Sequence, residues 1–286
     1  LLDKNDDYKK RFNQEINKIE SKYIIKHINK IDQLKNINFE LTILSTTATN
    51  RSKLLYNILE KISSKFILIE KPICQSINEL EDLRKISANN IFVNFPRRYC
   101  DWHKKIKNKL LHGKLNKIKS VKITGGYLGL ACNACHFIDL LNSWTNKYPV
   151  SIDVNGLGEW YVSKREGFYE VEGDLKVFYE EDLSLEINSL THKEGLKIKL
   201  YDNKKKLILH LNNDEGFAKF SDGEIIYGRL KYQSENTHNL LKLLQNNDEE
   251  ICNLNDAINS YNVLLKELIN NWNQKFKTNQ KKIKIT

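Results

Sequence analysis

The hydrophobic positions in the first third of the chain form short runs separated by stretches with helical periodicity. A helix with Asn50 as its N-cap is predicted over residues 51–61, and Ser76 followed by Glu79 has the form of a capping box that opens a second helix. Strands alternating with helices predict βαβ units and a parallel sheet covered on both faces. Three apolar runs predict the strands: Phe39–Ser45, Phe66–Ile69 and Ile91–Phe95.

After Pro149 the pattern changes to strands that alternate apolar and polar residues between turns. Such strands predict an open, mostly antiparallel sheet with one polar face. Helices are predicted at about 8–20, 101–111, 132–144, 235–246 and 254–274, and strands at 118–124, 175–179, 183–187, 196–201 and 207–211, with a turn at Gly125-Gly126. The change of pattern predicts two domains, 1–96 and 97–286.

The first domain is expected to be a Rossmann-like α/β domain that lacks its beginning, followed by an α+β domain. The 286-residue chain starts with Leu and contains no Met, so we expect residues to precede Leu1. The dinucleotide fingerprint G-x-G-x-x-G is absent, and Gly156-Leu157-Gly158 lacks the third glycine. If the first strand and glycine loop are missing, Asp3 ends the second strand, where an acidic residue receives the adenosine ribose hydroxyls.

The amino-acid composition argues against several classes of protein. The net charge is +10, but the 46 basic residues are seven Arg and 39 Lys, a bias that also enriches Asn and Ile. Arg is the residue preferred for recognising nucleic acids, so we expect no nucleic-acid partner. No apolar run is long enough to span a membrane, and no secretory signal is visible. Five cysteines, an odd number, favour a reducing, cytoplasmic setting over a disulfide scaffold.

Polar segments follow each predicted strand of the parallel sheet, where ligands of such sheets bind. The segments are Ser45–Arg51, Glu70-Lys71-Pro72 and Asn94–Arg98. An amine at a strand end can hydrogen-bond a reacting hydroxyl and stabilise the charge that develops on its oxygen during hydride transfer. A plain polar strand exit is the alternative interpretation of Glu70-Lys71-Pro72.

The segment from Cys132 to Asp139 carries a second candidate chemistry. Cys132, Cys135 and His136 match C-x-x-C-H, the attachment pattern of c-type haem. Attachment of haem requires export to an oxidising compartment, and a zinc site requires a second pair of ligands. A thioredoxin-like redox pair follows the first strand of a βαβ unit, which this segment does not. None of the three is therefore expected, and no metal is predicted. His136 at a helix start is a candidate general acid/base, and a structural histidine is the alternative.

Together, these segments resemble the Gfo/Idh/MocA family of oxidoreductases, which join a Rossmann domain to an α/β domain built on an open antiparallel sheet. The resemblance implies NAD or NADP as cofactor and hydride transfer to or from a carbohydrate carbon. It covers nearly the whole chain, through Leu41–Arg51, Phe66–Leu80, Asn94–Arg98, Gly125–Leu141 and Leu254–Trp272.

The resemblance also implies residue roles. Lys71 matches the lysine near the nicotinamide and the reacting hydroxyl, and His136 matches the proposed general acid/base. Cofactor contacts are expected from Thr46, Thr47, Glu70, Lys71 and Asn94. Substrate contacts from the second domain and its open sheet face are expected from Arg97, Arg98, Tyr127, Asn133 and Asp139.

One departure from the family leaves alternatives open. Many members have an aspartate four residues before the histidine, where this chain has Cys132. The Cys-Asn-x-x-His form looks similar to members associated with bacterial surface-glycan biosynthesis. The leading expectation is an NAD(P)-dependent dehydrogenase of a sugar or sugar nucleotide that forms homo-oligomers through its C-terminal sheet. A non-catalytic regulator on the same fold is the runner-up, and a nucleic-acid binder rests on charge alone.

Overall fold

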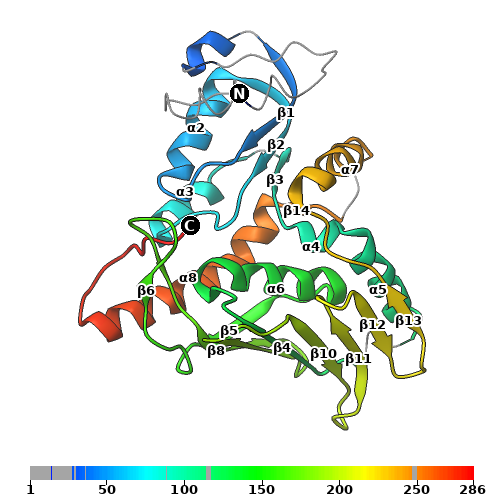
Figure 1. Ribbon diagram of the computed structural model, residues 1–286. Helices are drawn as coiled ribbons and strands as arrows, with labels where there is room; N and C mark the ends of the chain where they lie inside the picture. Colours follow the sequence, from blue (N-terminus) through cyan, green and yellow to red (C-terminus); the bar gives the residue numbers. More distant parts are fainter. Residues whose placement is uncertain are drawn as a thin grey trace.

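The computed structural model describes residues 14, 28, 30–35, 37–87, 89–113, 117–246 and 250–286, with the side chains of 234 and 238 excepted. Asp3 and the helix predicted at 8–20 lie outside the described residues, apart from position 14. In Figure 1 a small sheet with its helices lies above a broad second sheet, and a long helix runs between them.

The small sheet is parallel over its first three strands, as predicted. Its four strands lie in the order β1 (Asn38–Leu44), β2 (Ser63–Ile69), β3 (Ile91–Val93) and β14 (Cys252–Asn253), and β14 runs antiparallel to β3. The run Phe66–Ile69 in β2 is buried throughout because both faces of the sheet are covered.

Helices from distant parts of the chain cover the two faces of this sheet. The helices α2 (Arg51–Lys61) and α3 (Ile77–Arg84), with the short 3-10 helix η1 (Ile31–Leu34), pack on one face. On the other face, Leu240 and Leu244 of α7 (Gln233–Gln245) pack against Leu68 and Phe92. The parallel sheet is therefore completed by two elements, α7 and β14, that come more than 130 residues later in the chain.

The second sheet has eight strands and is antiparallel except where β4 pairs with β9. Its strands in spatial order are β13 (Ile225–Tyr227), β12 (Phe217–Phe220), β11 (Leu207–Asn212), β10 (Lys197–Tyr201), β4 (Ser120–Gly126), β9 (Ser184–Leu190), β8 (Gly173–Tyr179) and β5 (Pro149–Asp153). The predicted fold class, a parallel α/β sheet followed by an open and mostly antiparallel one, is confirmed.

The helix α6 (Leu130–Thr145) lies on the face of the second sheet that is turned towards the parallel sheet (Figure 1). The helix α8 (Leu254–Phe276) runs beside it and contacts both sheets. Three smaller elements complete this side: α4 (Pro96–Tyr99), α5 (Asp101–Leu111) and the hairpin of β6 (Tyr161–Val162) and β7 (Tyr169–Glu170). Residues from both sides therefore meet around α6.

The opposite face of the second sheet is open and polar. Across three neighbouring strands, Glu186 accepts from both Lys122 at 3.0 Å and Lys176 at 2.9 Å. Since α6 covers the other face, this open face lies away from the parallel sheet (Figure 1). Within the described residues, no helix combines the length and apolar character needed to cross a bilayer.

Two local expectations are wrong. Asn50 precedes α2 in a left-handed conformation and makes no side-chain cap, so it does not cap that helix as its residue type suggested. Gly125 and Gly126 continue β4 rather than form a turn. At Gly126 a Cβ atom would lie 1.9 Å from the His192 carbonyl oxygen, so the glycine is required by close approach of two backbones.

Candidate active site

Lys71 links the parallel sheet to helix α6. It follows β2 by two residues, at the carboxyl edge of the sheet. Its ammonium donates to Asn133 Oδ1 at 2.5 Å and to the Cys132 carbonyl oxygen at 3.4 Å. Both acceptors are uncharged, and an ammonium has three N–H groups. One donor of Lys71 therefore has no acceptor among these contacts.

Arg51 holds in place the loops that carry Lys71. It is 1% exposed, and its guanidinium donates to the carbonyl oxygens of Thr46, Glu70 and Pro72, which belong to the loops after β1 and β2. Burial lowers the pKa of Arg51 to about 10, so it remains a cation at neutral pH. This buried role of Arg51 was not predicted from the sequence, because an arginine at a helix start usually faces solvent.

The expected cofactor residues lie along the same sheet edge. Asn94 donates to Glu70 Oε1 at 2.6 Å and accepts from the Tyr99 hydroxyl at 2.7 Å. Because both ends of its amide are engaged, Asn94 orients the Glu70 carboxylate. Thr46 is exposed and Thr47 half-buried, so both hydroxyls can be reached from solvent.

His136 lies one helical turn after Asn133, on the same side of α6 as Lys71. Its ring packs edge-on against Phe95 with centroids 5.6 Å apart, and its Nδ1 atom is buried with no hydrogen-bond partner within the described residues. Burial, followed by the nearby charges of Lys71 and Arg97, lowers the pKa of His136 well below its usual value. The imidazole is therefore neutral at pH 7.

Arg97 is a second cation beside His136. Its guanidinium lies over the ring of Phe137, 4.8 Å from the centroid, and burial lowers its pKa to about 10. Neither Arg97 nor Lys71 forms an ion pair within the part of the chain that the structure describes. His136 is therefore flanked by positive charge.

A hollow of about 500 Å³ opens beside Lys71. Its wall includes a buried carboxylate, Glu170 at the end of β7, which is 7% exposed. Burial raises the pKa of Glu170 to about 7. The sequence analysis missed Glu170 because Tyr169-Glu170-Val171-Glu172 has the alternation of a solvent-facing strand. The hollow is lined by Lys71, Cys132, Asn133, Ser163, Lys164, Arg165, Glu170 and Thr286.

Two carboxylates cap the start of α6 next to this hollow. Ala131 N–H donates to Glu170 Oε1 at 2.6 Å, and Gly129 N–H donates to Glu172 Oε2 at 3.0 Å. They satisfy helix N–H groups that have no partner within the helix. Gly129 has φ +69°, and a Cβ atom there would lie 2.9 Å from Glu170 Oε2, so only glycine admits this carboxylate.

The segment after α8 closes one side of the hollow. Ile283 N–H donates to the Gln75 carbonyl at 3.1 Å, and the Gln75 side chain donates to the Ile285 carbonyl at 2.7 Å. Beyond them, the Cys132 thiol donates to the Thr286 carbonyl oxygen at 2.5 Å. Figure 1 shows the chain end beside α3. Residues from the loop after β2, from α6 and from this segment thus line one hollow.

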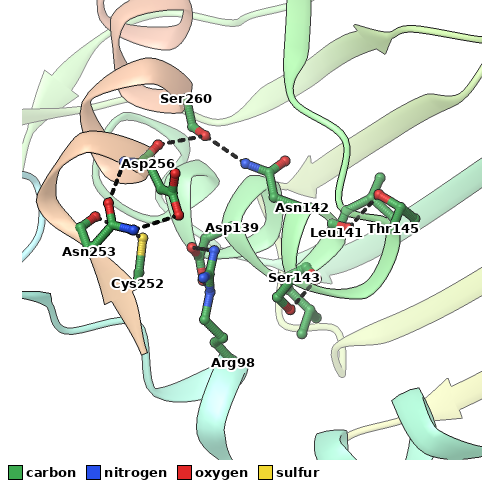
Figure 2. A network of polar contacts seen from close by, with 11 residues as sticks. Arg98, Asp139, Leu141, Asn142, Ser143, Thr145, Cys252, Asn253, Asp256 and Ser260 are labelled. Carbon is green, nitrogen blue, oxygen red and sulfur yellow. Dashed lines mark hydrogen bonds and ion pairs between the residues drawn. The ribbon is translucent and has the colours of Figure 1, made fainter. Parts of the chain in front are cut away.

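Two of the expected substrate residues, Arg98 and Asp139, are paired with each other and not with Lys71. Arg98 Nη2 lies 2.7 Å from Asp139 Oδ1, and its Nε donates to Oδ2 at 3.2 Å, with both side chains buried (Figure 2). A bidentate buried pair of this kind holds α4 against α6. Neither residue lines the Lys71 hollow.

A larger hollow, of about 720 Å³, lies near the other end of α6 and includes Arg98 in its lining. Many of its polar side chains are bonded to each other or to nearby backbone. The Asn142 amide lies 2.6 Å from the Ser260 hydroxyl, and Asn253 donates to Asp256 at 2.9 Å (Figure 2). Because these donors and acceptors are already satisfied, we do not place the active site there.

The remaining expected residues fall in different places. Asn133 lines the Lys71 hollow and contacts Lys71 directly. Tyr127 precedes α6 and is 63% exposed. The open sheet face does not adjoin the Lys71 hollow, because α6 covers the opposite face; substrate contacts from that face stay a prediction. Cys132 and Cys135 are free thiols, and Cys135 donates to the Cys132 carbonyl.

Solved structures of other proteins have a similar fold. No family model and no curated protein sequence matches the chain. The fold is similar to that of a dehydrogenase (MviM) from Clostridium difficile, with TM-score 0.63 and 14% identity over 94% of this chain and 89% of that one. Apo scyllo-inositol dehydrogenase from Lactobacillus casei gives TM-score 0.61 and 12% identity over 91% and 83%.

A regulator has the same fold. The super-repressor mutant of Gal80p from Saccharomyces cerevisiae gives TM-score 0.65 and 13% identity over 97% of this chain and 88% of that one. At these identities the comparisons show similarity of fold alone, a parallel α/β sheet joined to an open, mostly antiparallel sheet.

The residues around Lys71 fit the reactive end of a nicotinamide cofactor. Lys71 has a spare N–H, and the buried Nδ1 of His136, one helical turn after Asn133, has no partner within the described residues, so both have unused hydrogen-bonding capacity. His136 itself does not line the hollow beside Lys71. The hydroxyls of Thr46 and Thr47 lie at the edge of the parallel sheet where dinucleotides bind. The described residues include no glycine-rich phosphate loop at the start of a βα unit.

Proposed function

We propose that this protein is an NAD(P)-dependent oxidoreductase acting on a hydroxyl or carbonyl carbon of a sugar or sugar nucleotide. One observation carries the proposal: Lys71, at the edge of the parallel sheet, is hydrogen-bonded to Asn133, one helical turn before His136. An ammonium and an imidazole that are 65 positions apart in the chain therefore serve one site. The fold shared with dehydrogenases supports the same conclusion.

The chain's own residues would bind and orient the substrate. The free N–H of Lys71 donates to the reacting oxygen and stabilises the negative charge that develops there. His136, as a neutral imidazole, accepts a hydrogen bond from the substrate hydroxyl or donates one to the carbonyl. Asn133 fixes the direction of the Lys71 ammonium, and Arg51 fixes the loop from which Lys71 extends.

The cofactor would be held along the carboxyl edge of β1 to β3. Thr46 and Thr47 supply hydroxyls, and Glu70, oriented by Asn94, supplies a carboxylate. When bound, NAD or NADP supplies an acceptor or donor of hydride at its nicotinamide ring. Fixing cofactor and substrate in one cleft contributes to catalysis through proximity.

The test is a fluorescence titration of the protein, expressed from its complete gene, with NADH and with NADPH. We expect saturable binding of one or both, followed by NAD(P)⁺ reduction with at least one member of a panel of sugars and sugar nucleotides. Absence of saturable binding by either nucleotide contradicts the proposal.

The second candidate is a non-catalytic regulator that binds a nucleotide or sugar. Cys132 favours it, because the family's aspartate would stand at that position, and the Gal80p super-repressor has the same fold. NADH binding without turnover of any sugar in the panel would support the regulator.

Two further proposals concern cellular context and assembly. The Cys-Asn-x-x-His form of α6 supports a role in bacterial surface-glycan biosynthesis in the cytoplasm. The open face of the eight-stranded sheet, with its Lys122–Glu186–Lys176 ion pairs, supports association of two or more copies through that sheet. Sedimentation of wild type and of Glu186→Lys tests the second of these.

A further inference from the structure

Oxidation of a hydroxyl needs a group that takes up the hydroxyl proton. The two residues that the family resemblance implies, Lys71 and His136, are poorly suited to this. Lys71 already carries its proton as an ammonium. His136 lies between the positive charges of Lys71 and Arg97, which disfavour a second positive charge on the imidazole. His136 can accept a hydrogen bond from a hydroxyl, but taking the proton from it is costly.

Glu170 lies where it can take up this proton. Its carboxylate lines the same 500 Å³ hollow as Lys71 and Asn133. Its Oε1 accepts the N–H of Ala131 at 2.6 Å and of Val171 at 3.1 Å, and the Cys132 thiol also contacts the carboxylate. Neither backbone bond uses Oε2.

Glu172 is a natural comparison two residues further along. Its Oε1 accepts from the Tyr161 hydroxyl at 2.6 Å, and its Oε2 accepts both the Gly129 N–H and the Ser189 hydroxyl. Glu172 does not line the hollow. Both of its oxygens are engaged in the protein, whereas Glu170 borders open space.

We propose that Glu170 takes the proton from the substrate hydroxyl in this hollow and returns it in the reverse reaction; the inference rests on the proposed function. Glu170 supplies a carboxyl group to a site whose α6 residue, Cys132, cannot act as an acid or base at neutral pH. Burial raises the pKa of the Cys132 thiol, so it stays protonated.

The charge state of Glu170 agrees with this role. Burial raises its pKa to about 7, helped by Glu172 and opposed by hydrogen bonds from Val171, Cys132 and Ala131. Both protonation states are therefore populated near neutrality, which is the condition for efficient general acid–base catalysis. The titratable and charged groups around the carboxylate are Lys71, Cys132, Tyr161, Lys164, Arg165 and Glu172.

In the direction of oxidation, the substrate O–H bond breaks, and its proton forms a new O–H bond on Glu170. The electron pair left on oxygen forms the second bond of the carbonyl as the carbinol hydrogen departs as hydride to oxidised nicotinamide. The substrate loses two electrons, and NAD(P)⁺ is reduced.

The experiment compares wild type, Glu170→Gln, Glu170→Asp and the control Glu172→Gln, each expressed from the complete gene. Infrared spectra of each protein without ligand, recorded from pH 5 to 9, follow the carbonyl band of protonated carboxyl groups. NADH binding is measured by fluorescence, and kcat and KM over the same pH range with every sugar that wild type turns over.

We expect a carboxyl group that titrates near pH 7 in wild type and Glu172→Gln and is lost in Glu170→Gln. Glu170→Gln should lower kcat about a hundredfold and remove the inflection of the pH profile near 7, while NADH affinity stays within about twofold. Glu170→Asp, which keeps an acid, should retain an inflection and part of the rate.

The contrary outcomes are distinct. Turnover in Glu170→Gln with the wild-type rate and inflection overturns the inference and leaves the proposed function standing. NADH binding without turnover of any sugar favours the regulator and overturns the inference. Failure of wild type to bind NADH or NADPH overturns the proposed function and the inference together.

Discussion

The two ends of helix α6 carry the same kinds of side chain but use them differently. At the amino-terminal end, Lys71 bonds only to uncharged oxygens and His136 has an unpartnered buried nitrogen. At the carboxyl-terminal end, Arg98 is paired with Asp139, and Asn142 contacts Ser260. The first end has capacity for a ligand, whereas the polar groups of the second stabilise the protein.

This difference shows why residue type alone did not distinguish the residues at the amino-terminal end of α6 from the buried pair at its carboxyl-terminal end. Arg98 and Asp139 were expected at the substrate, as were Asn133 and Arg97. A buried charge pair that satisfies itself has little left to offer a ligand, because breaking it leaves an uncompensated charge.

The largest effect is expected from Arg98→Ala. It leaves the Asp139 carboxylate buried without its partner, and removal of one member of a buried pair costs about 3–5 kcal/mol. Urea unfolding of wild type and variant measures the change. An Arg98→Ala variant as stable as wild type would show that this pair does not hold α4 to α6. Lys176→Ala, which disturbs an exposed pair on the open sheet face, serves as the control.

At the other end of α6, Lys71→Ala and His136→Ala should each lower kcat by about a hundredfold or more and leave the unfolding midpoint nearly unchanged. The reason is that each removes a group that contacts the reacting oxygen without breaking an ion pair. Steady-state kinetics with the best substrate of the panel measures the change. Wild-type turnover in either variant would remove that residue from the mechanism.

A smaller loss is expected from Asn133→Ala, which removes the acceptor that orients the Lys71 ammonium. Hydrogen bonds to charged groups contribute about 1.5–3 kcal/mol, so kcat should fall at least about tenfold while KM for the cofactor changes little. Asn133→Asp keeps an oxygen acceptor and should recover much of the rate. If both variants behave alike, the Lys71–Asn133 contact has no role in orientation.

The smallest effect is expected from Ser260→Ala at the paired end of the helix. It removes the hydroxyl that lies 2.6 Å from the Asn142 amide, a loss of about 1 kcal/mol in the free energy of unfolding with no change in kcat. Urea unfolding and kinetics on the same preparation measure both quantities. A fall in kcat larger than the loss of folded protein would show that the two ends of α6 are functionally coupled.

Sequence patterns predicted the elements whose stability is local. Helices α2 and α5 have the predicted bounds, because their apolar periodicity repeats over three turns. The capping box before α3 is also present, since Ser76 accepts from Glu79 N–H at 3.2 Å. The two-residue strand β14 was missed, because a strand that short has no periodicity of its own.

Only part of the candidate site could be predicted from the sequence. The meeting of the Lys71 strand end with the His136 helix was expected from the family resemblance, and the structure shows Lys71 bonded to Asn133, one helical turn before His136. Arg51 and Glu170 were missed because burial of a charged residue depends on partners elsewhere in the chain, three carbonyl groups for Arg51 and a helix start for Glu170. Sequence periodicity reports which side of an element is apolar, not which polar group has been enclosed.

The late return of the chain to the small sheet has a practical consequence for dissecting the protein. A fragment that stops at residue 96 would lack α7 and β14, leaving Leu68 and Phe92 uncovered and the edge of β3 without its neighbour. Such a fragment should aggregate rather than fold. By the same reasoning, the intact chain should unfold in a single cooperative transition, because unfolding of either half exposes the hydrophobic core of the other to water.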